Sequence, residues 1–361
     1  MIQSIHIQNF KSIENQAFDF KPLTILTGTN SAGKSSIIQA ILLYSHRFNG
    51  NMLLDDYLAN LGKPSELLYI HSKDEFFLIN LKVASVKTAS LIFDKNKQSY
   101  HFDETEKKEA LFTLYTKDML IPSFEKNLYY ISANRIGQEN QSKIKEKIRC
   151  GVNGEYIFGF YESYKHVRLE NEKLISQRAT SKALNAQVNF WLSKILDLNL
   201  MPITQTIDNT SVKVFYQNFD LDDIEMPPFN LGAGVSYLTK ILILGLSLKE
   251  GDILIVENPE VHLHPKAISR FAEFFKLLVK GGIQVILETH SEHIINKMRY
   301  FVFEGQLSSK EVQIYYRERF DKPFDSIRIN DKGKYINVDD EIIEFPAGFF
   351  DSDLDELLEM M

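Results

Sequence analysis

The chain has 361 residues, of which 44% are hydrophobic and 25% are charged, which is enough apolar material for one elaborated domain or two smaller ones. A single cysteine, Cys150, excludes an internal disulfide framework and fits a reducing compartment, and no apolar stretch is long enough to span a bilayer. The net charge of −7 argues against a protein that coats DNA through a globally basic surface. We expect a cytoplasmic protein without a membrane partner.

The first 60 residues predict strands followed by a helix. Residues 5–7 and 18–20 alternate between apolar and polar positions, as half-buried strands do. Residues 23–27 form a short apolar run that ends at Gly28, and a helical apolar pattern follows from residue 37 to residue 42. This segment therefore predicts a strand, a glycine-rich loop and a helix in succession.

The middle of the chain gives weaker signals. Residues 76–83, 90–93, 128–132 and 212–216 predict short strands, and residues 179–196 have helical spacing. Residues 136–175 are polar and punctuated by glycine, which is typical of a mobile or inserted segment.

From Leu231 onward the alternation becomes clear. A helix is predicted up to Leu248, a buried strand over residues 252–256, a helix over 265–279 and a second buried strand over 283–287. Ser291 can cap the next helix, and residues 312–329 predict a hairpin. Strands that alternate with helices in this way predict an α/β fold with a mostly parallel sheet.

The strongest motif is the P-loop between the third predicted strand and its helix. It matches G-x-x-x-x-G-K-[ST], and we assign ATP binding to Gly28, Asn30, Ser31, Ala32, Gly33, Lys34, Ser35 and Ser36. Backbone amides and the helix N-terminus would hold the phosphates, Lys34 would reach the β and γ phosphates, and Ser35 would bind Mg²⁺. The alternative is an ordinary glycine-rich turn, which the flanking strand and helix disfavour.

Two further motifs follow buried strands. Glu257 ends an apolar run as a Walker B acid does, and we predict that it is a Mg²⁺ ligand, with a solvated strand end as the alternative. His290, in Glu288-Thr289-His290-Ser291, is predicted to contact the γ phosphate or the attacking water, although a lone histidine is more often structural.

A glycine-rich helix start and a histidine pair complete the set. The helix that begins after Leu231 opens with Gly232, Gly234 and Ser236 and offers a second anion-binding N-terminus. Beside the P-loop, this helix start predicts contact with a nucleotide held by another copy. Taken alone, the motif would indicate an ordinary glycine-rich helix entry. Glu260, His262 and His264 admit a metal site, which we consider the poorer interpretation because no cysteine or further acid supports it.

These motifs in this order resemble the ABC-type ATPase heads of the RecF, SMC and OLD-like group, and within it the small bacterial AAA-family ATPases of anti-phage defence, including the Septu-like ATPase subunit. Asn9-Phe10-Lys11-Ser12, the P-loop, residues 257–265, the Thr289-His290-Ser291 switch and residues 345–351 carry the resemblance. It implies an ABC-ATPase head with N-terminal antiparallel strands, a helical or irregular insertion and a small C-terminal subdomain.

The resemblance also implies boundaries and a mechanism. Residues 1–60 and 228–305 would form the head, 61–227 a lateral subdomain and 306–361 a C-terminal hairpin with an acidic tail. Two copies would enclose ATP and Mg²⁺, with Gly232, Gly234 and Ser236 of one copy facing the P-loop of the other. The predicted D-loop is 261–264, and Arg135 matches a recurrent arginine without an assigned role.

One departure from the family pattern bears on catalysis. Asn258 stands where related heads carry a second acid, and an amide can orient water but cannot accept its proton. Glu260 is two residues away and is the alternative base. We therefore assign catalysis to Glu260, Asn258 and His290 and expect a slow ATPase.

Three functions stay open at this point. The first is an ATPase sensor or scaffold that regulates a separate nuclease or toxin in anti-phage defence. The second is a RecF-like repair ATPase that contacts nucleic acid, and the third is a non-hydrolysing ATP-binding module that restrains a toxin. Residues 339–361 hold nine acidic residues and no Lys or Arg, which predicts a solvated helix face, with a docking tail as the alternative.

Overall fold

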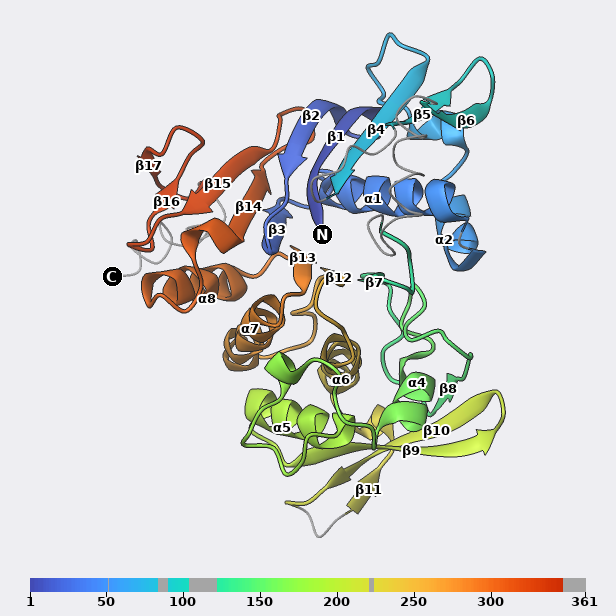
Figure 1. The fold of residues 1–361 in the computed structure, drawn as a ribbon, viewed down its shortest axis with the longest axis vertical. Coiled ribbons are helices and arrows are strands. Elements are labelled where there is room, and N and C mark those ends of the chain that lie inside the picture. Colours follow the sequence, from blue (N-terminus) through green and yellow to red (C-terminus); the bar gives the residue numbers. More distant parts are fainter. Residues whose placement is uncertain (51, 84–89, 104–121, 221–223, 347–361) are drawn as a thin grey trace, which may run out of the picture. The chain divides into compact units, whose positions relative to one another are not determined.

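The structure is a computed structural model, and it describes residues 1–50, 52–83, 90–103, 122–220 and 224–346 (Figure 1). The chain forms two compact units. We call residues 2–48, 59–121 and 288–361 the P-loop unit, and residues 1, 49–58 and 122–287 the signature unit. Among the described helices, none is long and apolar enough to cross a membrane.

The P-loop unit contains an antiparallel sheet of five strands in the order β2-β1-β4-β5-β6. The strands are β1 (Ile2–Phe10), β2 (Ile13–Asp19), β4 (Phe76–Val83), β5 (Ser90–Asp94) and β6 (Ser99–Phe102). Alternate side chains of β1 are buried, because Ile5 and Ile7 lie on the core face. The alternation predicted for the N-terminal strands is confirmed.

A second group of strands in this unit carries the P-loop. Strand β3 (Leu23–Gly28) pairs in parallel with β14 (Val312–Arg317), which pairs antiparallel with β15 (Asp325–Ile329). Strands β16 (Tyr335–Ile336) and β17 (Ile342–Ile343) continue the antiparallel edge. The helices are α1 (Lys34–Asn49), α8 (Glu292–Phe303) and the short 3₁₀ helices η2 (Pro64–Leu67) and η5 (Ser309–Glu311).

The signature unit contains the strand of the Walker B motif. Strand β12 (Ile253–Glu257) pairs in parallel with β7 (Leu128–Ile131) and neighbours β13 (Gln284–Glu288), whose last residue opens the P-loop unit. Helix α5 (Leu184–Leu196) packs against both α6 (Ala233–Leu246) and α7 (Pro265–Lys280). The short helices η1 (Met52–Leu54), α2 (Asp55–Ala59), η3 (Glu172–Leu174) and η4 (Pro228–Asn230) complete the set.

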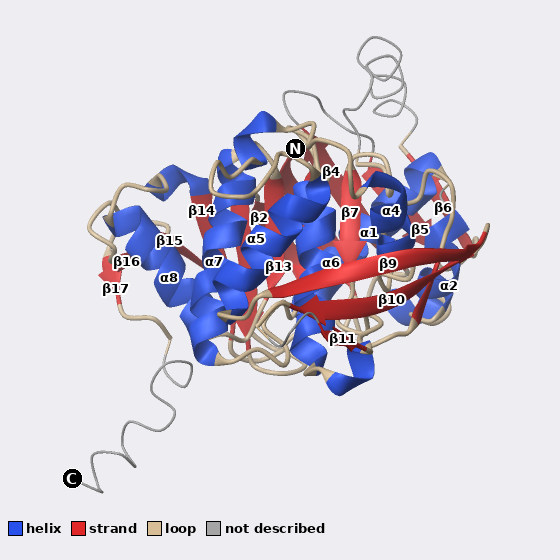
Figure 2. Cartoon of the chain, turned by 90° about the horizontal axis from the view of Figure 1, so that it is seen from below, coloured by secondary structure: helices blue, strands red, loops and turns tan. Residues whose placement is uncertain are grey.

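A small antiparallel sheet lies beside these helices. Strand β10 (Ser211–Asn218) pairs with β8 (Gln141–Lys143), β9 (Leu200–Asp208) and β11 (Ile224–Met226), and α4 (Ile157–Tyr164) packs on β8, β9 and β10. Figure 2 shows the long strands β9 and β10 running across the ends of the helices. The polar segment 136–175 thus holds β8, α4 and η3, which the sequence did not predict.

The predicted α/β class is confirmed: parallel strand pairs, flanking helices, N-terminal antiparallel strands and the 312–329 hairpin are all present. The predicted helix 179–196 was too long, because α5 begins at Leu184. The Gln187 side chain explains the difference: it accepts from the Ser176 amide at 2.8 Å and donates to the Ser181 carbonyl at 2.7 Å, which holds the preceding loop non-helical. The proposed domain boundaries stay a prediction, and the tail 347–361 lies outside the described residues.

A buried ion pair fastens residues 136–139 to helix α6. The Lys240 ammonium lies 2.5 Å from the Glu139 carboxylate, with side chains 0% and 12% exposed, and donates to the Ile136 carbonyl at 3.0 Å. Burial lowers the pKa of Lys240 and raises that of Glu139, and each partner opposes the shift of the other. The pair therefore depends on both charges.

Replacing Glu139 by Gln should destabilise the chain by about 3–5 kcal/mol, because a buried ammonium would lose its counter-charge. Urea unfolding followed by circular dichroism measures this. Glu146→Gln is the matched control, since the Glu146 side chain is 89% exposed, and it should change the unfolding free energy by less than about 0.5 kcal/mol. Equal effects of the two substitutions would contradict the assigned role of the pair.

Candidate nucleotide site

The P-loop follows β3 and ends where α1 begins at Lys34. Two of its positions admit only glycine. Gly28 has φ 134°, and an added Cβ would lie 2.0 Å from the Arg317 carbonyl oxygen; Gly33 has φ 91°, and its Cβ would lie 1.9 Å from the Ser12 hydroxyl. The loop is therefore shaped by the close approach of the Arg317 backbone to Gly28 and of the Ser12 side chain to Gly33.

Lys34 directs its ammonium back over this loop. Its Nζ donates to the carbonyls of Gly28 at 3.1 Å and Thr29 at 2.8 Å. Burial lowers the pKa of Lys34, and the nearby Glu288 carboxylate opposes that shift. An ammonium held at a ring of backbone groups suits the phosphates of ATP.

The Ser35 hydroxyl meets a carboxylate that the sequence analysis did not assign. Ser35 Oγ donates to the Glu288 oxygens at 2.9 and 3.1 Å. A hydroxyl and a carboxylate together supply the hard oxygen ligands that Mg²⁺ prefers. Glu288 stands at the end of a buried strand, just as Glu257 does, and that position was the signal from which it could have been found.

His290 lies beside the same loop. Burial and the Lys34 charge lower the pKa of His290, and a hydrogen bond involving the Gly28 backbone opposes them. The lowered pKa favours the neutral imidazole, which can accept one hydrogen bond and donate another. The P-loop unit therefore brings together Lys34, Ser35, Glu288 and His290.

The other predicted P-loop residues divide by exposure. Asn30 and Ser31 are exposed at the loop tip, with Ser31 at φ 60°, while Ala32 and Ser36 are buried. The Ser36 and Ser12 hydroxyls lie 3.2 Å apart. Contacts of these four residues with ATP stay predictions.

A residue far along the chain, Arg317, holds the loop in place. At 4% exposure, it donates from Nη1 to the Ser12 hydroxyl at 3.1 Å and the Ala32 carbonyl at 3.0 Å, and from Nη2 to the Ser12 carbonyl at 2.9 Å. The Arg317 carbonyl also accepts from the Thr29 amide at 3.2 Å. Arg317 thus ties the end of β14 to the P-loop and to the β1–β2 turn, and no sequence motif marked it.

In the signature unit, Glu257 ends β12 and is 7% exposed. Its Oε2 accepts from the Ala133 amide at 2.9 Å. Burial raises the pKa of Glu257, whereas the hydrogen bonds from Ala133 and Tyr130 and the Arg135 charge lower it. Its assignment as a Mg²⁺ ligand stays a prediction.

The loop after Glu257 is fixed by its backbone. Arg135 donates to the carbonyls of Glu257 at 2.7 Å and Asn258 at 2.8 Å. Asn258 has φ 46°, which asparagine tolerates better than most residues, and its buried Oδ1 has no hydrogen-bond partner among the described residues. Burial lowers the pKa of Arg135, and the Glu260 charge opposes that shift. Asn258 and Glu260, the two candidate catalytic residues of this loop, therefore both interact with Arg135.

An aromatic stack joins this loop to helix α6. The Arg135 guanidinium lies 4.7 Å from the ring centre of Tyr237, and Tyr237 stacks on His262 with ring centres 5.5 Å apart and an angle of 12°. His264 caps α7 by accepting from the Lys266 amide at 3.2 Å. The two histidines thus have structural contacts, and no cluster of three metal-binding side chains occurs in the described ranges.

The three residues predicted to meet a second copy differ in accessibility. Gly232 is the exposed N-cap of α6, and an added Cβ there would meet nothing within 4 Å. Packing within a single copy requires glycine at position 234, because an added Cβ would lie 2.4 Å from the His262 carbonyl oxygen. Ser236 is 1% exposed, so its predicted role would require the side chain to become accessible.

Comparison with known proteins decides the family. The family described as "AAA ATPase domain" matches residues 1–194, which is more than half of the chain. The chain belongs to this family. Residues 132–296 of the ATPase also match the family described as "AAA domain, putative AbiEii toxin, Type IV TA system".

Two curated relatives of this ATPase are a nuclease and a repair protein. It is 23% identical over 339 residues to the Old nuclease of Escherichia phage P2, covering 82% of this chain and 57% of that protein. It is 29% identical over 101 residues to the DNA replication and repair protein RecF of Azobacteroides pseudotrichonymphae genomovar. CFP2, covering 28% of each. The chain thus spans 57% of the length of the first of these relatives and 28% of the second.

Solved structures agree on the fold of this ATPase. An SMC head bound to the C-winged helix domain of ScpA has a TM-score of 0.56 at 12% identity, covering 91% of this chain and 97% of that chain. The Pyrococcus furiosus Smc head with an extended coiled coil has a TM-score of 0.53 at 12% identity, covering 100% and 99%. The predicted ABC-type ATPase head is confirmed.

Arg317→Met should raise the Kd for ATP about tenfold or more, because the P-loop would lose the side chain that holds Ser12 and Ala32. Isothermal titration calorimetry measures this. Arg317→Lys should recover little affinity, since an ammonium cannot replace the guanidinium fork. Arg319→Met is the control, because the Arg319 side chain is 63% exposed and pairs with Asp321. This variant should bind ATP as the wild type does.

Arg135→Met should lower ATP turnover about tenfold while changing the Kd for ATP by less than about twofold, because it loosens the Asn258 loop rather than the P-loop. Turnover and binding are measured on the same preparation. Tyr237→Phe keeps the ring beneath the guanidinium and should stay near wild-type turnover. A weakened ATP affinity with unchanged turnover would refute this assignment.

Proposed function

We propose that this ATPase hydrolyses ATP slowly, pairs with a second copy around the nucleotide and regulates a separate effector, a nuclease or toxin, in defence against phage. The observation that carries the slow hydrolysis is the environment of Asn258. Its buried Oδ1 follows the Walker B strand and has no hydrogen-bond partner among the described residues, so this oxygen can orient a water but cannot take its proton. Glu260 is the remaining acid of the loop.

ATP and Mg²⁺ fit the residues of the P-loop unit. The buried Lys34 ammonium would bind the phosphates, and the Ser35 hydroxyl with the Glu288 carboxylate would bind the metal ion. Mg²⁺ would neutralise charge on the phosphates. His290, kept neutral by its lowered pKa, would orient the water or the γ phosphate through one ring nitrogen.

Pairing rests on the start of α6. Its first N–H groups lie after the exposed Gly232, where nothing crowds an added atom, and a helix N-terminus attracts phosphate. Since each chain has its own P-loop, we propose that this helix start faces the nucleotide of a second copy. Bound ATP would then stabilise the contact between the two copies.

The defence role and the separate effector rest on the relatives. One matched family is described as a putative toxin of a Type IV toxin–antitoxin system, and one relative is named a nuclease of a phage. We propose that the effector is a second protein, and we transfer no nuclease activity from this relative to the chain. The alternative is a repair ATPase that contacts nucleic acid, which the RecF match favours.

Mass measurement by light scattering with and without ATP and Mg²⁺ tests the pairing. Wild type should double in mass with ATP, whereas Lys34→Ala and Gly232→Asp should not, the latter because a carboxylate would repel phosphate. Gln177→Asp, which adds a carboxylate at an exposed position of the same unit, is the matched control and should pair normally. A Gly232→Asp variant that pairs like wild type would contradict the proposal.

Turnover of two variants tests the catalytic assignment. Asn258→Glu should raise turnover by a factor of about 10² or more, because a positioned base contributes on that scale. Glu260→Gln should lower the remaining turnover if Glu260 is the base; equal turnover in wild type and Glu260→Gln would favour the non-hydrolysing module. Stimulation by DNA would favour the repair ATPase, and co-purification with the product of a neighbouring gene would support the separate effector.

A further inference from the structure

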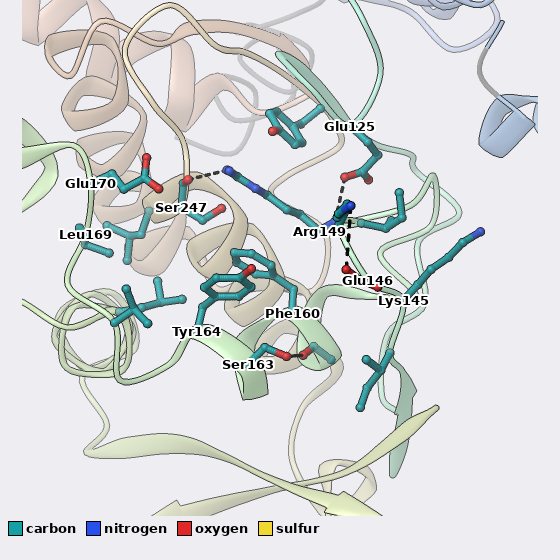
Figure 3. A pocket seen from close by; sticks show the side chains of 18 of the residues that line it. Glu125, Lys145, Glu146, Arg149, Phe160, Ser163, Tyr164, Leu169, Glu170 and Ser247 are labelled. Atoms are coloured by element: carbon teal, nitrogen blue, oxygen red, sulfur yellow. Dashed lines mark hydrogen bonds and ion pairs between the residues drawn. The ribbon is translucent and has the colours of Figure 1, made fainter. Parts of the chain in front are cut away.

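A pocket of about 490 Å³ in the signature unit contains none of the residues assigned above to ATP, Mg²⁺ or catalysis (Figure 3). It lies among the segment 144–149, helix α4, the loop 167–170 and the end of α6. All of its lining residues fall within 125–247, so the pocket belongs to one compact unit. Its volume is in the range of pockets that hold small molecules.

Two stacked aromatic rings line one side of the pocket. Phe160 and Tyr164 lie on α4 with ring centres 4.7 Å apart and an angle of 25° between the rings. Phe160 covers one face of the Tyr164 ring, yet Tyr164 is 49% exposed, which leaves ring surface that a ligand in the pocket can reach. A flat aromatic ring can extend this stack.

Arg149 holds a guanidinium above these rings. Its Nη1 donates to the Ser247 carbonyl at 2.6 Å, and its guanidinium lies 5.3 Å from the Tyr129 ring and 5.5 Å from the Phe160 ring. Figure 3 shows Arg149 reaching toward Ser247 with Phe160 and Tyr164 beneath it. Within the described part of the chain, its Nε and Nη2 groups donate no hydrogen bond, so they can bind an anion.

The charged side chains of the lining leave a positive excess, because five are basic and three are acidic. Two of the acids are engaged: Glu125 accepts from the amides of residues 149–151, and Glu170 pairs with Lys249 at 2.7 Å. The third, Glu146, has only a 4.0 Å contact with a neighbouring lysine, and both side chains are almost fully exposed. The basic residues are Lys126, Lys145, Lys147, Arg149 and Arg168.

These features together indicate the chemistry of a ligand. The exposed ring surface of Tyr164 suits a planar aromatic group, whereas a guanidinium beside exposed lysines suits a phosphate, which presents several oxygens to several donors. Ser163 and Asn209 add a hydroxyl and an amide to the lining, which can hydrogen-bond to sugar hydroxyls. A nucleotide carries all three groups in one small molecule.

We propose that the pocket between the segment 144–149 and helix α4 binds a mononucleotide, as a site additional to the P-loop. The base stacks on Tyr164, and the phosphate contacts Arg149, Lys145 and Lys147. A nucleic-acid strand is the less suitable ligand, because it needs aromatic rings for successive bases. The lining offers only the stacked pair on α4, since its remaining aromatic ring, that of Tyr129, is 1% exposed.

Isothermal titration calorimetry of the full-length chain with AMP, GMP, CMP and UMP tests this proposal. The chain carries Lys34→Ala, so that the P-loop lacks its phosphate-binding ammonium. At least one of the four nucleotides should bind saturably. It should bind about tenfold or more tightly than its own nucleoside and than inorganic phosphate, because ring and phosphate contacts both contribute.

Variants of the lining then assign the binding to this pocket. K145E/K147E should weaken it about tenfold or more, since two attractive charges become repulsive. Tyr164→Ser should weaken it through lost stacking, whereas Tyr164→Phe keeps the ring and should retain the affinity. The matched control is K213E/K280E, which reverses two exposed lysines of the same unit outside the lining and should leave the affinity unchanged.

Three outcomes would overturn the proposal. The first is no saturable binding of any of the four nucleotides, and the second is an equal loss of affinity in K145E/K147E and in the control. The third is a single-stranded oligonucleotide that binds more tightly than every mononucleotide and depends on Lys145 and Lys147, which would point to nucleic acid.

Hydrogen exchange locates the bound nucleotide without any change in the pocket. In the Lys34→Ala chain, the nucleotide should slow exchange of the amides of residues 144–149 and 160–168 and leave those of residues 28–36 unchanged. Slower exchange confined to residues 28–36 would contradict the assigned site. Neither measurement depends on ATP turnover or on pairing, so its outcome is independent of the function proposed above.

Discussion

The geometry of the P-loop depends on one buried guanidinium. Arg317 contacts the β1–β2 turn through Ser12 and the loop itself through Ala32, while its own carbonyl bonds to the Thr29 amide. Three segments separated by up to 305 residues are joined at this point. Because the guanidinium is planar and rigid, it fixes their relative positions at little cost in side-chain entropy. The close approach of the Arg317 backbone to Gly28 and of the Ser12 side chain to Gly33 belongs to that arrangement.

The signature unit uses the same device at its own loop. Arg135 bonds to two successive carbonyls after β12 and stacks on Tyr237, which in turn stacks on His262. The residues that would govern hydrolysis and the helix that would meet a second copy therefore share one set of contacts. Arg135, Tyr237 and His262 thus form one set of packed contacts between the start of α6 and the Asn258 loop.

The sequence by itself determined the α/β class, the position of the P-loop and the buried strands that end at Glu257 and Glu288, because each depends on neighbours along the chain: an apolar run, a glycine, a helix start. It did not reveal Arg317, Glu288 or the role of Arg135. Their partners lie far away in sequence, at Ser12, Ser35 and Glu257, and no periodicity marks such contacts. The tertiary structure also decided that Gly234 is required by the backbone of His262 and that Ser236 is buried, because only packing shows which side of a helix start is covered.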